Sequence, residues 1–280
     1  MPVRIVTDST ADLPSKLAEE LGITVVPLNV HFGTESYEDR VTITEEEFYQ
    51  RLLQGPIFPT SSQPSAGAFA ETYQRLAPQS SGIVSIHVSS LLSGTINSAL
   101  VGRDSAGVGC PIEIVDTSSV SMGEGLTVLA AARAAQSGAS FEEVVEVARR
   151  TLARVQTRAV FDTLEYLRRG GRAGRAQVFL GTLLGVKPIV KIEGEVHPIE
   201  RVRTRGKAHE RLRDFVQSAG RLEEGAVLYS TDRDEAEAFG ERIASLFPSG
   251  QLHLARLGPV VGTYAGPGLL GVAILTAETP

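Results

Sequence analysis

The sequence contains a single cysteine, Cys110, among 280 residues. One cysteine excludes an intramolecular disulfide framework and any metal site built from several cysteines. The histidines are scattered along the chain and have no metal-ligand spacing. Aromatic residues make up only 6%, the net charge is −6, and no recognised nucleic-acid-binding motif is present. These features argue against a protein that binds nucleic acid.

Long apolar runs are also absent, since no segment approaches the run of about 20 apolar residues that a membrane-spanning helix needs. The longest candidate, residues 259–275, is interrupted by four glycines and a proline. The first residues lead directly into an expected strand, without the basic and apolar parts of an export signal. We therefore expect a cytoplasmic protein with no stable membrane insertion.

The composition, with 42% hydrophobic and 21% charged residues, is typical of a soluble globular protein with a full core. The charge is unevenly distributed along the chain. Residues 1–155 hold 10 basic and 18 acidic residues, a net of −8, and the remainder has a net of +2. Within that remainder, residues 158–213 hold 13 basic and 6 acidic residues, a net of +7. This asymmetry suggests two lobes, the second with a positive surface.

The first half alternates between expected strands and helices. Apolar and β-branched runs predict strands at residues 3–7, 23–30, 82–88 and 111–115. Apolar stripes and capping residues predict helices at residues 12–21, 44–55, 66–76, 94–101, 125–136 and 141–155. Such alternation indicates βαβ units and a mostly parallel sheet.

The second half has a different pattern. Residues 187–192 and 195–203 are joined by Glu193-Gly194 and predict a hairpin. A strand from residue 158, strands at 226–230 and 251–257, and helices after residue 203 and at 232–246 complete it. We expect an α/β protein of two lobes: a Rossmann-like parallel-sheet domain at 1–157 and an α/β domain with an antiparallel sheet at 158–280.

The stretch SIHVSSLLSGTINSA, residues 85–99, carries the sharpest signal for a site. It predicts a buried strand, a turn, and a helix with Ser93 as its N-cap. The backbone amides of Gly94 and Thr95 would then point outward at the positive end of the helix dipole, which suits a carboxylate or phosphate. An ordinary serine cap without a ligand is the alternative.

Hydroxyl-rich segments follow several of the expected strands: Ser9-Thr10, Thr60-Ser61-Ser62, residues 89–95 and residues 117–119. Ligands of parallel sheets bind beyond the carboxyl ends of the strands. The segment at 59–65 is expected to be an irregular turn. Convergence of these segments on one edge predicts a site for the polar head of a ligand, although hydroxyls also occur simply as turns and caps.

Enzyme interpretations have weaker support. His87, a serine of the loop that follows it, and Asp8 or Asp116 could form a nucleophilic triad. No Gly-x-Ser-x-Gly elbow is present, and His87 alternates with apolar residues as a core histidine does. The glycine pattern at 266–271 matches a dinucleotide-binding fingerprint only literally, because no βαβ unit surrounds it.

A set of motifs occurs in a fixed order along nearly the whole chain: VTDSTADLP, PTSSQPS, SSLLSGT, LEYLRRGGRAG with KPIV, VRTRGKA and GPVVGTYAGPGLLG. In these motifs the sequence resembles the DegV family of fatty-acid-binding proteins. The resemblance implies a two-lobed fold with one long-chain fatty acid between the lobes. It also implies a carrier without catalytic activity of its own, which presents the acyl carboxylate to a fatty acid kinase for acyl-phosphate formation feeding phospholipid synthesis.

The resemblance also implies which residues bind the carboxylate. They are the hydroxyl residue before Ser-Gln-Pro, here Ser61, the serine of Ser-Gly-Thr, here Ser93, and a C-terminal histidine that is replaced here by Tyr264. Ser61 stands where threonine is typical. A tyrosine donates one hydrogen bond and stays neutral near pH 7, so it stabilises the carboxylate charge less than a protonated histidine does. Thr60 and Ser62 flank Ser61 and complete the expected ligand-binding set, together with Gly94 and Thr95.

Two further expectations concern the second lobe. Candidate residues for the wall of the acyl tunnel are Val178, Phe179, Leu180, Leu183, Leu184 and Ile189, which as plain core residues would look the same. Arg172, Arg203 and Arg205 are the expected docking residues for the kinase, with an ordinary solvated face as the alternative. No cofactor is expected besides the bound fatty acid. The alternative function is a serine hydrolase or a small-anion (phosphate) ligand enzyme at the same sheet edge.

Overall fold

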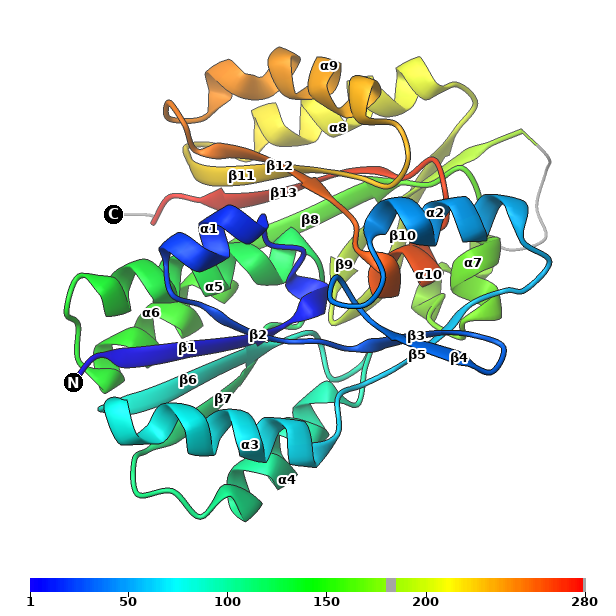
Figure 1. The fold of residues 1–280 in the computed structure, drawn as a ribbon. Helices are drawn as coiled ribbons and strands as arrows, with labels where there is room; N and C mark the ends of the chain where they lie inside the picture. The colour runs from blue at the N-terminus through cyan, green and yellow to red at the C-terminus, as the bar shows by residue number, and fades with distance from the viewer. Residues whose placement is uncertain (180–184, 279–280) are drawn as a thin grey trace.

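The computed structural model describes residues 1–179 and 185–278, which stack in alternating layers of helix and sheet (Figure 1). The first sheet has the strand order β2 (Thr24–Val26), β1 (Val3–Asp8), β6 (Gly82–His87) and β7 (Ile112–Asp116). All of its strand pairs are parallel, as the alternation of strands and helices predicts. Carboxyl ends of its strands therefore meet at one edge.

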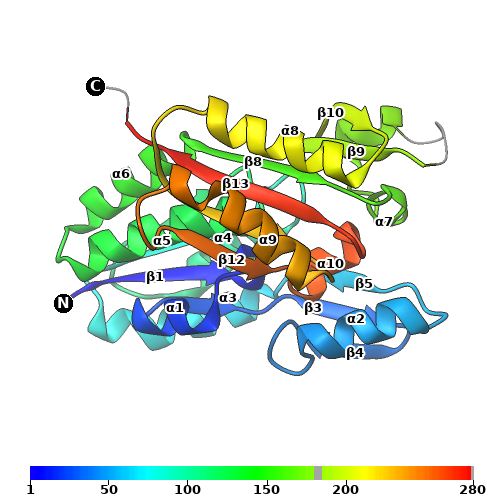
Figure 2. The same cartoon turned by 90° about the horizontal axis from the view of Figure 1, so that it is seen from above.

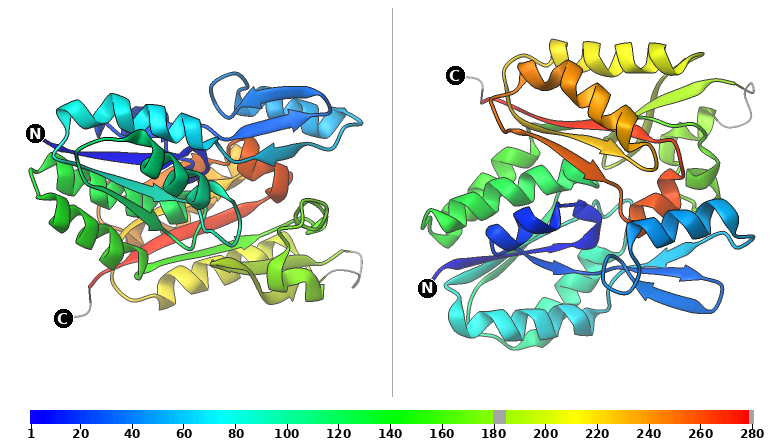
Figure 3. Two further views of the ribbon diagram at one scale, coloured as in Figure 1. Left: turned by 90° about the horizontal axis from the view of Figure 1, so that it is seen from below. Right: turned by 45° about the horizontal axis from the view of Figure 1, so that its top comes forward.

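Helices cover both faces of this first sheet. On one face lie α3 (Ala66–Leu76) and α4 (Thr95–Ala106), seen from below in the left view of Figure 3. On the other lie α5 (Met122–Gln136), α6 (Phe141–Leu152) and the short α1 (Ser15–Glu20). Strand alternation explains the two cores, because Val6 and Ile83 pack against α3 while Ile5 and Val84 face α5.

The expected strand at 23–30 is wrong in one respect, because the chain splits it between two sheets. Residues 27 and 28 separate β2 from β3 (Asn29–Phe32), which belongs to a small antiparallel sheet with β4 (Glu35–Glu38) and β5 (Thr60–Ser62). The predicted irregular turn at 59–65 thus contains a strand. Helix α2 (Glu45–Gln54) packs beside this sheet and begins with the capping box of Thr44 and Glu47, as its sequence predicts.

The second sheet has the strand order β10 (Glu195–Val202), β9 (Lys187–Glu193), β8 (Val155–Val160), β13 (Leu270–Thr276), β11 (Leu222–Tyr229) and β12 (Leu252–Arg256). Its pairs are antiparallel except β11 with β12, and the predicted hairpin at Gly194 is present as β9 and β10. Strand β13 is not among the strands expected from the sequence, although its apolar run Leu270–Thr276 is a clear strand signal.

The outer face of this sheet is covered by α8 (Arg205–Ser218) and α9 (Arg233–Ile243), which lie over its strands in Figure 2. Two short helices, α7 (Glu165–Arg169) and α10 (Pro259–Ala265), lie at one end of the sheet near α2 and β5. Among the described residues, no helix is long and apolar enough to cross a lipid bilayer.

Helix α5 is the shared middle layer between the two sheets. Its side chains are buried around the whole circumference, as expected for a helix enclosed on all sides. Arg133 on α5 forms a two-pronged ion pair with Glu224 on β11, with N–O distances of 2.6 and 2.7 Å. The tip of the β9–β10 hairpin contacts the loops that follow β6 and β7. There the Ser89 hydroxyl donates to the Gly194 carbonyl at 2.5 Å, and the Gly194 amide donates to the Ser118 carbonyl.

Candidate functional site

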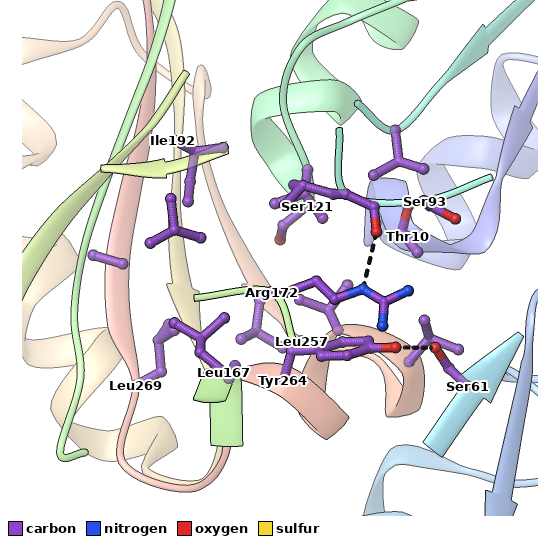
Figure 4. A pocket seen from close by; sticks show the side chains of 18 of the residues that line it. Thr10, Ser61, Ser93, Ser121, Leu167, Arg172, Ile192, Leu257, Tyr264 and Leu269 are labelled. Atoms are coloured by element: carbon purple, nitrogen blue, oxygen red, sulfur yellow. Dashed lines mark hydrogen bonds between the residues drawn. The ribbon is translucent and has the colours of Figure 1, made fainter. Parts of the chain in front are cut away.

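One cavity lies between the two sheets, at the carboxyl edge of the first. Its apolar wall on the side of the second sheet consists of Ala159, Phe161, Ile192, Val196, Leu228 and Leu269. The loops at the carboxyl edge of the first sheet, β5 and α10 supply most of the opposite wall, which includes polar side chains as well (Figure 4). The cavity therefore combines a long apolar surface with a polar end, the combination that small-molecule sites usually have.

Strand alternation explains the apolar wall. Every second residue here lines the cavity: Thr157 and Ala159 on β8, and Phe161 directly after it. Between them, Val160 faces the other way and packs in the core under α8 and α9. The sheet thus presents one face to the cavity and the other to its own helices.

At the polar end, the phenol of Tyr264 and the hydroxyl of Ser61 are 2.6 Å apart and share a hydrogen bond (Figure 4). Tyr264 lies in the last turn of α10, and Ser61 lies on β5, so the pair joins residues far apart in the sequence. Gly170 makes room for the tyrosine ring, since a Cβ there would lie 2.3 Å from Tyr264 Cδ1.

The guanidinium of Arg172 lies over the ring of Tyr264, 5.0 Å from its centroid. Its Nε donates to the carbonyl of Leu92 at 3.2 Å, and its Nη1 donates to the carbonyl of Gly170 at 2.7 Å. Neutral carbonyls orient the arginine without neutralising it. A positive charge is therefore held at the polar end of the cavity, beside the two hydroxyls (Figure 4).

The loop before α4 differs in detail from the expectation. The helix begins at Thr95 with Gly94 as its N-cap, so the prediction of Ser93 as the N-cap is wrong by one residue. Ser93 instead points toward the cavity, and its hydroxyl lies 2.9 Å from that of Thr95. The Ser93 hydroxyl also accepts a long hydrogen bond, 3.4 Å, from the Thr95 amide, so the side chain lies between the helix start and the cavity.

The structure brings part of the expected ligand-binding set together. Ser61, Ser62, Ser93 and Tyr264 line the cavity, whereas Thr60, Gly94 and Thr95 do not. The Ser62 hydroxyl also lies 3.0 Å from Nε2 of His31, which ties it to β3.

The expected docking arginines fall into three different environments. Arg172 lines the cavity, and Arg203 is exposed and has no ion-pair partner in the part of the chain that the structure describes. Arg205 is engaged within the protein, because its guanidinium pairs with both oxygens of Glu235 at 2.6 and 2.5 Å.

The expected tunnel wall is wrong where the structure describes it. Val178 is 69% exposed, Ile189 is buried in the core on the far face of the second sheet, and Phe179 does not line the cavity. Leu180, Leu183 and Leu184 lie outside the described residues. Strand residues of the second sheet line the cavity instead. Hydrophobicity alone does not distinguish those strand residues from the apolar stretch that begins at residue 178.

The family model described as the DegV family matches residues 2–277. The chain belongs to the DegV family. A DegV domain-containing protein of Streptomyces coelicolor is 41% identical over 278 residues, which cover 97% of this chain and 98% of that protein.

Solved DegV structures share the whole fold. A DegV family protein from Thermus thermophilus, described by its fatty acid binding, has a TM-score of 0.91 and 36% identity and covers 99% of this chain and 100% of its own. DegV of Bacillus subtilis, described as a fatty acid binding protein, has a TM-score of 0.89 and 30% identity with the same coverage. The α/β fold with a parallel four-stranded sheet and a second, largely antiparallel sheet is therefore that of the DegV family.

Next to the cavity, which Thr10 also lines, this DegV chain contains a buried group of polar side chains, here called the sheet-edge cluster: Asp8, Thr10, Ser85, His87 and Glu124. His87 Nδ1 lies 3.0 Å from Asp8, and its Nε2 lies 2.7 Å from the Ser85 hydroxyl. The serine that contacts His87 is therefore Ser85, and not a serine of the following loop as the possible triad required. Ser85 is completely buried, and His87 contacts no hydroxyl of the loop at 89–93 among the described contacts.

The pKa of Glu124 is shifted upward in this cluster. Burial raises the pKa of its carboxyl well above the ordinary value, and the nearby Asp8 carboxylate raises it further. Thr10 Oγ1 lies 2.5 Å from an oxygen of Asp8 and 3.1 Å from an oxygen of Glu124. A hydroxyl has one proton to donate, so a protonated Glu124 supplies the second. Every member of the cluster is thus hydrogen-bonded within the protein.

Two more buried carboxyls lie nearby. Burial raises the pKa of Asp12 to about 6, against the attraction of Arg40. Burial likewise raises the pKa of Asp39 to about 7, with a contribution from Asp12. One oxygen of each, Oδ2 of Asp12 and Oδ1 of Asp39, has no hydrogen-bond partner within the described part of the chain. In the described residues, no group of three histidine, cysteine or acidic side chains has the geometry to hold a metal ion.

Proposed function

We propose that this DegV chain binds one long-chain fatty acid in the cavity between its sheets. The observation that carries the proposal is the combination of an apolar wall with a polar end formed by Ser61, Tyr264, Ser93 and Arg172. The descriptions of the Thermus thermophilus and Bacillus subtilis structures as fatty-acid-binding support the choice of ligand.

The energetics of the cavity are consistent with such a ligand. Burying methylenes contributes about 0.8 kcal/mol each, so a long acyl chain contributes on the order of 10 kcal/mol before the losses of binding. A carboxylate buried without donors would cancel much of that gain. In our proposal, Ser93 and one hydroxyl of the Ser61–Tyr264 pair donate to the carboxylate, the other hydroxyl of the pair donates within the pair, and Arg172 neutralises the carboxylate charge. Arg172 thereby supplies the charge that Tyr264, unlike a histidine, does not carry.

We further propose that the chain is a carrier that acts in the cytoplasm and presents the bound carboxylate to a fatty acid kinase. The acyl phosphate formed there would feed phospholipid synthesis. The basic segment at 158–213 supports docking of an acidic partner. Arg203 is the best candidate for this contact because it is exposed and unpaired among the described residues, whereas Arg205 is neutralised by Glu235.

The ligand is tested by mass spectrometry of an organic extract from freshly purified protein. We expect one fatty acid per wild-type chain and a clear loss in Ser93→Ala and in Arg172→Gln. Ser90→Ala is the matched control, because Ser90 lies in the same loop but is exposed and does not line the cavity. Wild-type protein that is empty and takes up no added fatty acid contradicts the proposal and favours a small anion.

The kinase step needs a separate measurement. With a fatty acid kinase and ATP, acyl-phosphate formation on Arg203→Glu should fall while the amount of bound acid stays at the wild-type level. Arg221→Glu, another exposed arginine, outside the basic segment, is the control. Equal rates for wild type and Arg203→Glu would exclude this arginine as the docking contact.

A further inference from the structure

The cavity reaches the protein surface at its polar end. Gln63 is the only exposed side chain among the described residues that line the cavity, and Ser61, Ser93 and Tyr264 at the same end are half-buried (Figure 4). The residues of the apolar wall are buried, except Ile192, which is half-buried. The exposed edge of the cavity between Gln63 and Ser93 is here called the mouth. A fatty acid bound as proposed above has its carboxylate near this mouth.

The side chain of Gln63 crosses from β5 toward the start of α4. A Cβ on Gly94 would lie 2.9 Å from Gln63 Nε2, 3.1 Å from its Cδ and 3.5 Å from its Oε1. The whole carboxamide therefore rests against the Cα of Gly94. Gly94 has a φ of −76°, which any residue adopts, so a glycine is needed here for the close approach and not for its backbone conformation.

The carboxamide of Gln63 has unused hydrogen-bonding capacity. Its contact with Gly94 is a packing contact, and the carboxamide has no hydrogen-bond partner in the part of the chain that the structure describes. The neighbouring Ser62 hydroxyl, in contrast, lies 3.0 Å from His31 Nε2. Nε2 of a glutamine carries two N–H donors. An exposed donor group is therefore available at the mouth.

A bound carboxylate has room for such a donor. It accepts about four hydrogen bonds. Ser93 offers one proton, and the Ser61–Tyr264 pair offers one more, because its other proton is used within the pair. Arg172 offers mainly its Nη2, because its Nε and Nη1 already donate to backbone carbonyls. These groups supply about three donors, and an oxygen position left without a donor weakens binding.

We propose that the carboxamide of Gln63 is a further binding group for the carboxylate, with Nε2 donating to the oxygen nearest the mouth. Gly94 is a positioning residue, because it lets the carboxamide lie across the mouth and acts through it. This inference rests on the proposed function and adds a neutral donor to the charged one, Arg172.

The test uses fatty-acid-free full-length protein and calorimetric titration with palmitate and with oleate. Gln63→Ala should bind both acids about fivefold more weakly than wild type, as the loss of one partly exposed hydrogen bond permits. Gln63→Glu has nearly the same size and should bind more weakly than Gln63→Ala, because a second carboxylate would then face that of the ligand.

A double-mutant cycle tests the role of Gly94. Gly94→Ala should also weaken binding about fivefold, because the added methyl group displaces the carboxamide. In the Gln63→Ala background the same change should cost less than twofold, because the group that it displaces is already absent. Gly67→Ala on α3 is the control: the nearest atom to a Cβ there is Ser65 Oγ at 3.6 Å, Gly67 does not line the cavity, and affinity should stay unchanged.

Two outcomes overturn the inference while the proposed function stands. In one, Gln63→Ala binds both acids as wild type does, which means that water at the mouth supplies the missing donor. In the other, Gly94→Ala costs the same in both backgrounds, which means that the glycine does not act through the carboxamide. If wild-type protein binds neither acid, the proposed function itself is wrong. A thermal melt checks the folding of each variant, and if Gly94→Ala does not fold, the two variants of the exposed Gln63 decide the question.

Discussion

The sheet-edge cluster and the polar end of the cavity both consist of polar side chains, but they differ in how completely those side chains are hydrogen-bonded within the protein. In the cluster, Asp8, His87 and Glu124 are all hydrogen-bonded within the protein and fully buried. Along the cavity, Ser61 and Tyr264 hydrogen-bond only to each other among the described residues. Saturated polar groups stabilise a fold, whereas groups with free hydrogen-bonding capacity are available to a ligand. The two regions should therefore respond to substitution in opposite ways.

The largest effect is expected from Asp8→Ala. This change leaves His87 Nδ1, the Thr10 amide and the Val88 amide without their acceptor in a buried site. We expect a loss of about 3–5 kcal/mol in the free energy of unfolding, measured by urea denaturation. Asp116→Ala is the control, because Asp116 also ends a strand of this sheet but accepts from the amides of exposed residues, Ser90 and Ser118. Equal losses in the two variants would contradict the special role of the cluster.

A smaller effect is expected from pH, through Asp12 and Asp39. Folding raises their pKa values from 3.8 to about 6 and about 7, so the folded state favours their neutral forms. Their stabilising contribution is complete below the unfolded pKa and is lost as pH rises through the folded values. The free energy of unfolding should therefore fall steadily between about pH 4 and pH 7.

This pH effect is separable from that of exposed acids such as Glu47, whose hydrogen bond to the Thr44 amide lowers its pKa. Those groups lose their contribution only at more acidic pH. Asp39→Asn should flatten the slope between pH 4 and pH 7, as followed by urea denaturation at a series of pH values. A wild-type profile that is flat over this window would show that the two carboxyls are not neutral in the folded protein.

The smallest effect on stability, and a clear effect on binding, is expected from Tyr264→Phe. The ring remains beneath Arg172, but the phenol that pairs with Ser61 is lost. Fatty acid affinity should fall about tenfold, while the free energy of unfolding changes by less than about 1 kcal/mol. Tyr37→Phe removes a phenol that donates to Glu35 away from the cavity, and it should leave affinity unchanged. Unchanged affinity in Tyr264→Phe would exclude the phenol as a donor to the ligand.

Local signals in the sequence predict much of this fold. Helix α3 occupies Ala66–Leu76 as expected, and the capping box of Thr44 and the turn at Gly194 are where the pattern places them. These features are determined by residues close together in the chain, so a short stretch of sequence is enough to predict them.

Features that depend on distant residues were less predictable. Arg172 was expected on a docking surface because it lies in a basic segment, but contacts with Leu92 and Tyr264 hold it at the cavity. The sequence carries no signal for which face of β8 lines the cavity, since the pairing of β8 with β13 and β9 decides it. The strand at 23–30 was predicted as continuous because the sequence does not reveal that its two halves pair with different sheets.

The strand order of the second sheet has a consequence for how the chain is made. Strands β8, β9 and β10 on one side are joined to β11 and β12 on the other only through β13. β8 ends at Val160, whereas β13 begins at Leu270, so synthesis leaves a long interval before the joining strand exists. During that interval β8 and β11 each have an open edge of unpaired backbone groups, which can template pairing with other chains. A nascent chain is therefore most exposed to aggregation late in translation, and chaperones that shield strand edges would protect it most at that stage.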